Sequence, residues 1–350
     1  MGYEKQIVEL CTKLCHSKEE KIIFEDSLKH NINWDRLISC LLHHRLLLIF
    51  YYHLKCDNIC YIVPKEYLNL MRIKYNSNVI RIFEYIKNIG EIVYEFDRNN
   101  IPYVITKGFY FLSNIYKNYD INIREFGDVD FLISENCLTL VKQILENKGF
   151  VQGKYMENIK KIHEASRRDL IEKRLNSHEI YPFVKVFNWI SQLNAIDTVI
   201  VDINFTIFEG GVNKSPIPTQ YMLDKRKKST IDNILYFSSL SDEHNFINIC
   251  YHIYMDTLYD SKKKNLNDFL LVKFVDLKLF LDAKSEHLDW NYICDNLTSD
   301  KINDSIVFSL YIIKKLYGNK YDGLNAKYFN LEPKKEIREK ADRYLSSIYD

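Results

Sequence analysis

Two acidic residues lie inside an otherwise apolar stretch, and this pattern limits the fold more than any other feature of the chain. Residues 127–134 read GDVDFLIS, with Asp128 and Asp130 two positions apart. In a β-strand, residues i and i+2 point to the same face, so both carboxylates would project together, while Val129 and Phe131 would face a hydrophobic core. Two unpaired carboxylates this close repel each other and are costly to bury. The pattern therefore predicts a buried strand with one face that binds a cation.

The segments around this strand predict a mixed α/β region in the middle of the chain. Residues 101–106 read as a short strand, and a helical stretch follows at 109–118. An amphipathic helix is expected over 135–149. A further strand, rich in β-branched residues, is expected over 197–211. The polar stretch 155–195 between the second and third strands is interpreted as an insert or a hairpin over the site.

Both flanks of this region read as helical. From Leu68 to Phe96, apolar residues recur every three or four positions, which predicts one long amphipathic helix after Pro64. Low glycine and proline content, 10 and 6 of 350 residues, also favours helices over a turn-rich all-β fold. We predict an α+β fold with a small mixed β-sheet core. The chain would divide into a helical N-terminal region (1–98), an α/β core (99–215) and a helical C-terminal domain (216–350).

Composition favours a cytoplasmic protein with no membrane partner. The formal net charge is +1, so no overall positive field favours long nucleic acid. None of the eight cysteines forms a C-x-x-C pair, and we expect them to be reduced, without a zinc site. The apolar run RLLLIFYYHL is too short to cross a bilayer and is interpreted as a core helix.

Other polar residues could complete a phosphate-binding site around the acids. Asp202 is a third acid in an apolar strand, and three carboxylates on adjacent strands would hold Mg²⁺ or Mn²⁺ together with substrate phosphates. Arg124 and Lys107 supply cations, and Gly108 would begin a helix whose N-terminal amides favour anions. Gly127 would permit a close backbone approach just before the acids.

The same residues resemble a known family. The order of Lys107-Gly108, Ile115-Tyr116 and the run R-x-x-G-D-V-D-F-L-I from Arg124 is similar to the nucleotidyltransferase superfamily that includes polymerase beta. It resembles more closely a bacterial family of uncharacterised nucleotidyltransferases. The sequence VDINF, with Asn204, stands where that family has an E-L-H-W-like strand. The resemblance spans residues 40–285 and is specific over 105–133, and it implies a nucleotidyltransferase core with helical flanks.

The resemblance implies a metal-dependent transfer of a nucleoside monophosphate from a nucleoside triphosphate, such as ATP, to an acceptor, with release of pyrophosphate. The metal would be held by three acids: Asp128, Asp130 and Asp202. The nucleotide would contact residues of the two motifs and a histidine that the family has before an apolar-proline segment: Lys107, Gly108, Arg124, Gly127 and His178. The acceptor stays open among a small molecule, a peptide and a protein.

Two other functions fit the same sequence. One is a catalytically inactive module that binds a nucleotide or a partner protein through the same pocket. The other is a modifier of RNA or protein of the toxin–antitoxin type. Nucleotide binding without pyrophosphate release would favour the first, and arrest of cell growth that depends on Asp128 would favour the second.

Overall fold

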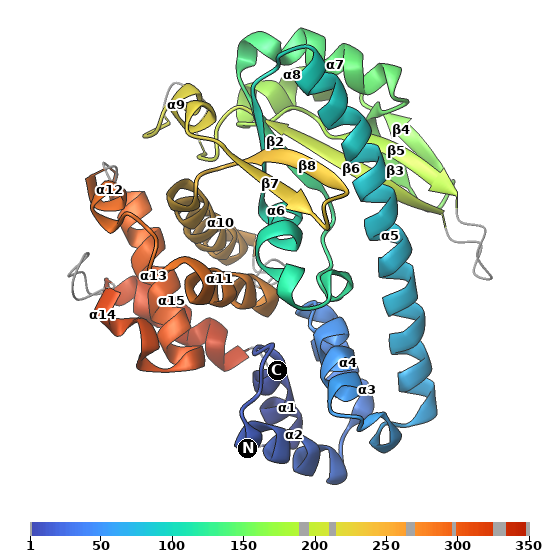
Figure 1. The fold of residues 1–350 in the computed structure, drawn as a ribbon, viewed down its shortest axis with the longest axis vertical. Coiled ribbons are helices and arrows are strands. Elements are labelled where there is room, and N and C mark those ends of the chain that lie inside the picture. Colours follow the sequence, from blue (N-terminus) through green and yellow to red (C-terminus); the bar gives the residue numbers. More distant parts are fainter. Residues whose placement is uncertain are drawn as a thin grey trace. The chain divides into compact units, whose positions relative to one another are not determined.

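A computed structural model describes most of the chain as two compact units (Figure 1). The described residues are 2–188, 196–209, 215–263, 270–295, 299–324 and 334–347. One unit consists of residues 1–78, 122–124 and 246–350, and the other consists of residues 79–121 and 125–245. The first unit is helical, and the second contains the β-sheet and the acidic residues. Each unit is therefore assembled from separate parts of the sequence.

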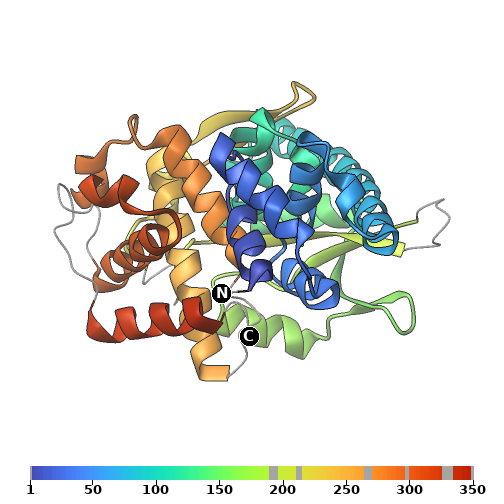
Figure 2. The same ribbon diagram turned by 90° about the horizontal axis from the view of Figure 1, so that it is seen from below.

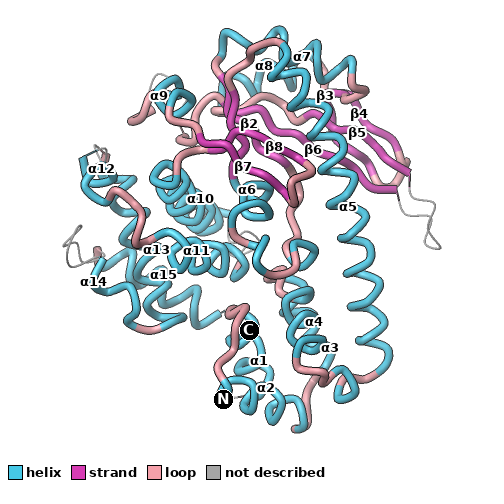
Figure 3. Tube along the Cα trace, viewed as in Figure 1, coloured by secondary structure: helices cyan, strands magenta, loops and turns pink. Residues whose placement is uncertain are grey.

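The second unit is built around one mixed sheet (Figure 3). Among the described residues, eight strands lie in the order β4-β3-β5-β6-β2-β1-β8-β7. The strand bounds are β1 Tyr103–Thr106, β2 Val129–Ile133, β3 Val151–Met156, β4 Lys161–Glu164, β5 Phe183–Asn188, β6 Ile196–Asn204, β7 Lys227–Ile231 and β8 Leu235–Ser239. Strand β2 is antiparallel to β1 and parallel to β6. The predicted α+β fold with a mixed sheet is confirmed.

Alternation along the central strands separates an apolar face from a polar one. Val129 and Phe131 of β2, with Val201 and Ile203 of β6, belong to one buried cluster. That cluster also contains residues of the second half of α5 (Lys65–Arg98), of α6 (Lys107–Asn114) and of α7 (Leu138–Asn147). The intervening strand residues point to the opposite face. The long helix after Pro64 and the core role of Val129 and Phe131 are thus as the sequence predicted.

The sheet extends further along the chain than residue 215. Residues 227–239 form the hairpin of β7 and β8 in the region that we had expected to be helical, and the compact unit runs to residue 245. Its turn contains Asp232 and Asn233, both with positive φ (48° and 57°). Asp and Asn tolerate this left-handed conformation better than most residues do. The sequence therefore contained a turn signal here that we did not use.

The stretch between the second and third predicted strands contains regular structure. Strands β3 and β4 form a hairpin, and α8 (Arg167–Asn176) and β5 follow it. A short helix, α9 (Thr219–Asp224), precedes β7. The expectation of an insert or a hairpin is therefore met by a hairpin, a helix and a strand that widens the sheet.

The first unit is made of helices from both ends of the chain. The N-terminal helices are α1 Tyr3–Cys11, α2 Lys18–Lys29, α3 Trp34–His43 and α4 Leu47–Cys56. The C-terminal helices, orange and red in Figure 2, are α10 Asp242–Lys263, α11 Leu271–Lys284, α12 Trp290–Asp295, α13 Asp300–Tyr317, α14 Asp322–Leu324 and α15 Lys335–Ser347. The first residues of α10 belong to the other unit.

The apolar run RLLLIFYYHL forms α4, whose residues are mostly buried, and a break separates it from α3. Arg45, with φ of 55°, separates the two helices. In the described part of the chain, no single helix is both long and apolar enough to cross a membrane. The α3–α4 pair meets that criterion only when its two helices, bent by 115°, are taken together.

Candidate active site

The pairing of β1, β2 and β6 determines where the acidic residues lie. Asp130 of β2 pairs with Thr106 of β1 on one side and with Asp202 of β6 on the other. Paired residues of neighbouring strands point to the same face, so the Asp130 and Asp202 side chains project together. Two acids that are far apart in the sequence thus become neighbours on the face opposite the apolar core.

Asp128 extends this acidic face toward solvent. It directly precedes β2 and is exposed, whereas Asp130 is only 2% exposed. The Asp128 carboxylate contributes to the raised pKa values of both Lys107 and Asp202, which places its charge within reach of both groups. The three acids expected to hold a metal therefore lie on one face, with Asp128 at its accessible end.

Lys107 supplies a cation to the acidic face. Its Nζ donates a hydrogen bond to Asp130 Oδ1 at 2.7 Å. It is the first residue of α6 and has a φ of 55°, a conformation that residues other than glycine adopt infrequently. Burial opposes the charge on Lys107, but the carboxylates of Asp130 and Asp128 outweigh burial and raise the pKa of the ammonium group. The lysine is therefore held charged against the acids.

The two predicted glycines differ in their surroundings. A Cβ on Gly108 would lie 2.8 Å from Phe126 Cβ, which is closer than real contacts allow. Gly108 is therefore required for the packing of α6 against the segment before β2. A Cβ on Gly127 would meet no atom within 4 Å, so no crowding by the protein demands glycine there. The open space over Gly127 lies next to Asp128.

Asp202 is held in its neutral form. Burial is the main cause, and the negative charges of Asp130, Asp128 and Glu179 add to it, which raises the pKa of Asp202 to about 8. A carboxylic acid with this pKa keeps its proton at neutral pH as long as no cation besides Lys107 binds next to it. The site thus holds more negative charge than its own side chains neutralise.

The side-chain oxygen of Asn204, together with those of the acids, suits a hard divalent cation. Its Nδ2 donates to Asp130 Oδ1 at 3.3 Å, which fixes the orientation of the amide. Its Oδ1 is buried and, within the described part of the chain, has no hydrogen-bond partner. A buried acceptor without a partner is costly unless something else satisfies it. Carboxylate and amide oxygens are the ligands that Mg²⁺ and Mn²⁺ prefer, so Asp128, Asp130 and Asp202 fit such an ion.

Arg124, which we had expected to bind phosphate, forms a buried ion pair within the helical unit. It belongs to the helical unit and is buried. Its guanidinium donates to both carboxylate oxygens of Asp276 in α11, with Nε–Oδ1 and Nη2–Oδ2 distances of 2.9 and 2.6 Å. This two-point ion pair occupies the Nε–Nη2 edge of the guanidinium, which is one of the edges that could bind a phosphate.

His178 lies next to the acidic face, on the segment that runs beside the end of β6. Its backbone oxygen accepts a hydrogen bond from Phe205 N at 3.0 Å. Burial, together with the positive charge of Lys107, lowers the pKa of His178 although Glu179 and Asp130 oppose this. The imidazole is therefore neutral at pH 7 and is available as a hydrogen-bond donor or acceptor.

The sequence reasoning missed Glu179. Glu179 forms an isolated antiparallel bridge with Asn204, so its side chain joins the acidic face. Its carboxylate also forms an ion pair with Lys173 of α8. No local pattern identifies this residue, because the bridge pairs segments that are separated in the sequence. Only the register of residues 178–180 against the end of β6 reveals it.

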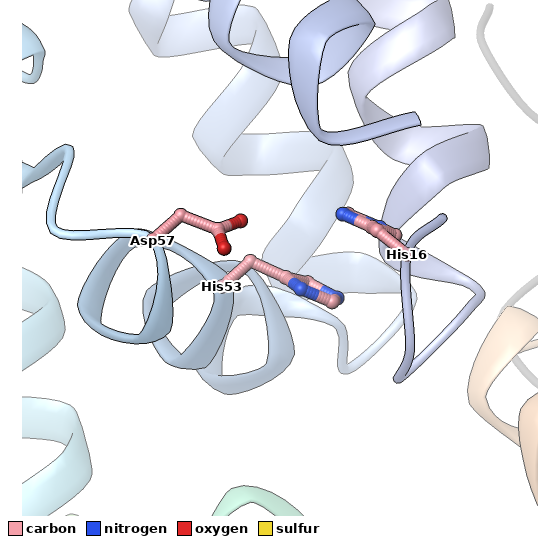
Figure 4. A group of neighbouring side chains, drawn as sticks. All are labelled: His16, His53 and Asp57. Carbon is pink, nitrogen blue, oxygen red and sulfur yellow. The ribbon is translucent and has the colours of Figure 1, made fainter. Parts of the chain in front are cut away.

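A second group of potential metal ligands lies in the helical unit (Figure 4). Ligand atoms of His16, His53 and Asp57 lie within 4.8 Å of one another. The two rings stack with 3.9 Å between centroids and 6° between planes, so their in-plane lone pairs do not converge on one point. Both Nε2 atoms contact backbone carbonyls, and Lys21 already pairs with Asp57 at 2.6 Å. The group is therefore organised as a stack of half-buried His16 on buried His53, and burial lowers the pKa of His53 to about 3.

Comparisons with known proteins identify the family of this chain. The family described as "Uncharacterised nucleotidyltransferase" matches residues 30–318. A solved structure of an antigenic nucleotidyltransferase-like protein from Paracoccidioides brasiliensis is similar over 73% of this chain and 97% of its own, at 14% identity and a TM-score of 0.35. No curated protein matches the chain. Because the family match covers most of the sequence, including every acidic residue of the site, this chain belongs to the uncharacterised nucleotidyltransferase family.

Proposed function

We propose that the chain transfers a nucleoside monophosphate from a nucleoside triphosphate to an acceptor and releases pyrophosphate in a metal-dependent reaction. One observation carries this proposal: Asp130 and Asp202 are paired in register, beside an Asn204 oxygen that has no partner among the described residues. The carboxylates of the acidic face carry more negative charge than its lysines neutralise, so the face is suited to a divalent cation and the nucleotide that the cation binds. Membership of a nucleotidyltransferase family supports the same reaction class.

In the proposed reaction, an oxygen or nitrogen of the acceptor forms a bond to the α-phosphorus. The bond from the α-phosphorus to the bridging oxygen breaks, and pyrophosphate leaves with the electron pair. Asp202 would accept the acceptor's proton, and a divalent cation bound at the site would lower the pKa of Asp202. When bound, Mg²⁺ or Mn²⁺ would stabilise the negative charge on the phosphate oxygens.

The other side chains have roles in binding and orientation. Asp128 and Asp130 would hold the metal, and Lys107 keeps Asp130 in place through their 2.7 Å hydrogen bond. The Gly108 amide, in the first turn of α6, is a donor for a phosphate oxygen. Neutral His178 contacts the nucleotide from the neighbouring segment. The acceptor is a small molecule, a peptide or a protein.

The first test is a thermal-shift panel on the full chain with ATP, GTP, CTP and UTP, each with and without Mg²⁺. A ligand that binds only the folded state raises the melting temperature. We expect a metal-dependent rise for at least one nucleotide in the wild type and no rise in Asp128→Asn/Asp130→Asn. Glu157→Gln, on the exposed β3–β4 hairpin, removes a charge elsewhere in the same unit and serves as the control.

The second test measures pyrophosphate release with candidate acceptors. Release that is lost in Asp130→Asn supports transfer. If a nucleotide binds and no acceptor gives pyrophosphate, the site acts as a nucleotide-binding module. If no nucleotide binds with or without Mg²⁺, the proposed function is wrong.

A further inference from the structure

The segment 178–180 continues the sheet beside the acidic face. Phe205 N donates to His178 O at 3.0 Å, and Ile180 N donates to Ile203 O at 3.1 Å. These two bonds flank Glu179 and Asn204, so the two residues form a non-hydrogen-bonded antiparallel pair. Side chains of such a pair lie on the same face and closer together than in a hydrogen-bonded pair. Glu179 therefore lies beside Asn204, which itself bonds Asp130.

Glu179 holds a lysine from α8 at this place. Lys173 Nζ pairs with Glu179 Oε1, and the Lys173 side chain is 33% exposed. Helix α8 begins with a capping box at Ser166, and none of its residues is buried. Ion pairs therefore help to hold α8 in place. Lys173 pairs with Glu179, and Arg174 pairs with Glu135 at 2.7 Å.

The charges of this pair reach the acidic face. Glu179 contributes to the raised pKa values of Lys107 and Asp202, and Lys173 contributes to the lowered pKa of His178. The pair thus belongs to the same electrostatic neighbourhood as the residues of the proposed site, although α8 lies far from the acidic strands in the sequence.

The site needs a cation for phosphate that the sequence motif does not supply. Arg124 is engaged by Asp276, and Lys107 is bonded to Asp130. Lys173 and Lys107 are similarly exposed, with 33% and 30% of the side chain accessible, but Lys173 pairs with Glu179, which is not one of the acids assigned to the metal. A triphosphate carries several negative charges, and a lysine ammonium binds phosphate oxygens as a compact point charge.

On the basis of the proposed function, we propose that Lys173 binds the phosphate groups of the nucleotide and that Glu179 is the positioning residue that holds its ammonium group at the site. Lys173 would donate one of its three N–H bonds to a phosphate oxygen while Glu179 keeps another. Neither residue forms or breaks a covalent bond.

The test measures binding of Mg²⁺-tripolyphosphate by calorimetry, because this probe has the phosphates of a nucleotide and no base. MgATP, MgGTP, MgCTP and MgUTP are measured in parallel. We expect Lys173→Gln to weaken tripolyphosphate binding about tenfold and Glu179→Gln to weaken it about threefold, since one charge-assisted contact is lost or loosened. Lys173→Arg should retain most of the affinity. Arg168→Gln removes an exposed positive charge from the same helix and should bind as the wild type does.

A charge reversal separates phosphate binding from a merely structural ion pair. Lys173→Glu/Glu179→Lys restores an ion pair of opposite direction, so its melting temperature should stay near that of the wild type. Its tripolyphosphate affinity should fall at least as far as that of Lys173→Gln. Full affinity in the reversed variant would mean that the pair only holds α8, and the inference would be wrong.

Other outcomes distinguish this inference from the proposed function. If the wild type binds a nucleotide in a manner that Asp128→Asn/Asp130→Asn abolishes, but Lys173→Gln has no effect, only the present inference fails. If Lys173→Gln loses affinity and Glu179→Gln does not, the positioning role of Glu179 is refuted. If the wild type binds neither tripolyphosphate nor any nucleotide, both the proposed function and the present inference are wrong.

Discussion

At the scale of single residues, the two glycines beside the acidic face should respond differently to alanine. Gly108→Ala places a Cβ 2.8 Å from Phe126 Cβ, so the segment must shift, at a cost of about 1–3 kcal/mol. Gly127→Ala enters open space and should change stability by less than about 0.5 kcal/mol. Urea denaturation measures both. Equal losses in the two variants would show that contact with Phe126 is not what requires glycine at position 108.

Asp202 should make stability depend on pH when chelator is present. Its folded-state pKa of about 8 lies above the ordinary value, so the folded protein binds more protons than the unfolded chain between about pH 4 and 8. Its contribution to the free energy of unfolding therefore falls as pH rises through this interval. Asp202→Asn lacks this protonation contribution, so its free energy of unfolding relative to the wild type should rise by about 4 kcal/mol between pH 5 and pH 9.

Urea denaturation in EDTA at these two pH values measures the difference. Glu157→Gln, which lies on an exposed hairpin, is the control and should show no such pH dependence relative to the wild type. A difference in stability between Asp202→Asn and wild type that is the same at both pH values would contradict a neutral, half-buried Asp202.

At the scale of elements, Tyr85 of α5 holds the two acidic strands together where their pairing ends. Its hydroxyl donates to Gly127 O at 2.7 Å and accepts from Ile200 N at 3.2 Å. Tyr85→Phe removes both bonds and should cost about 1–3 kcal/mol. Because Gly127 precedes Asp128, metal-dependent nucleotide binding should weaken as well.

The matched control for Tyr85 is Tyr94→Phe, which removes a hydroxyl from an exposed residue of the same helix. Melting temperature and nucleotide affinity are measured for both variants. If Tyr85→Phe loses stability and keeps full nucleotide affinity, the hydroxyl supports the fold and does not position Asp128.

Helices and strands were predicted correctly where the sequence has a clear local periodicity. The apolar stripe from Leu68 to Phe96 and the alternation around Asp130 are local periodicities, and α5 and β2 formed as they indicate. The sequence did not predict the hairpin of β7 and β8, because its strands are only five residues long and lack a clear alternation of polar and apolar residues. The Asp232-Asn233 turn is its one local signal.

At the scale of the whole molecule, Arg124 ties residues 122–124 to the C-terminal helices of the helical unit. Arg124→Met leaves the Asp276 carboxylate buried without its cation and should cost about 3–5 kcal/mol. Arg124→Met/Asp276→Leu removes both charges and should recover part of this loss. Chemical denaturation measures the free energy of unfolding of the wild type and of both variants.

The same double variant separates stability from phosphate binding. We expect it to bind Mg²⁺-tripolyphosphate as the wild type does, because the guanidinium is committed to Asp276. A loss of affinity comparable to that of Lys173→Gln would show that Arg124 does bind phosphate.

The sequence by itself determined the strand that carries Asp130 and begins directly after Asp128, the third acid in a second strand, and the helical flanks. These features depend on periodicities within a few residues, which set the direction of each side chain. Tertiary structure alone decided that Arg124 pairs with Asp276, 152 positions away, and that Glu179 joins the acidic face beside Asn204. Strand register and helix packing join distant segments, and no local periodicity records which partners they bring together.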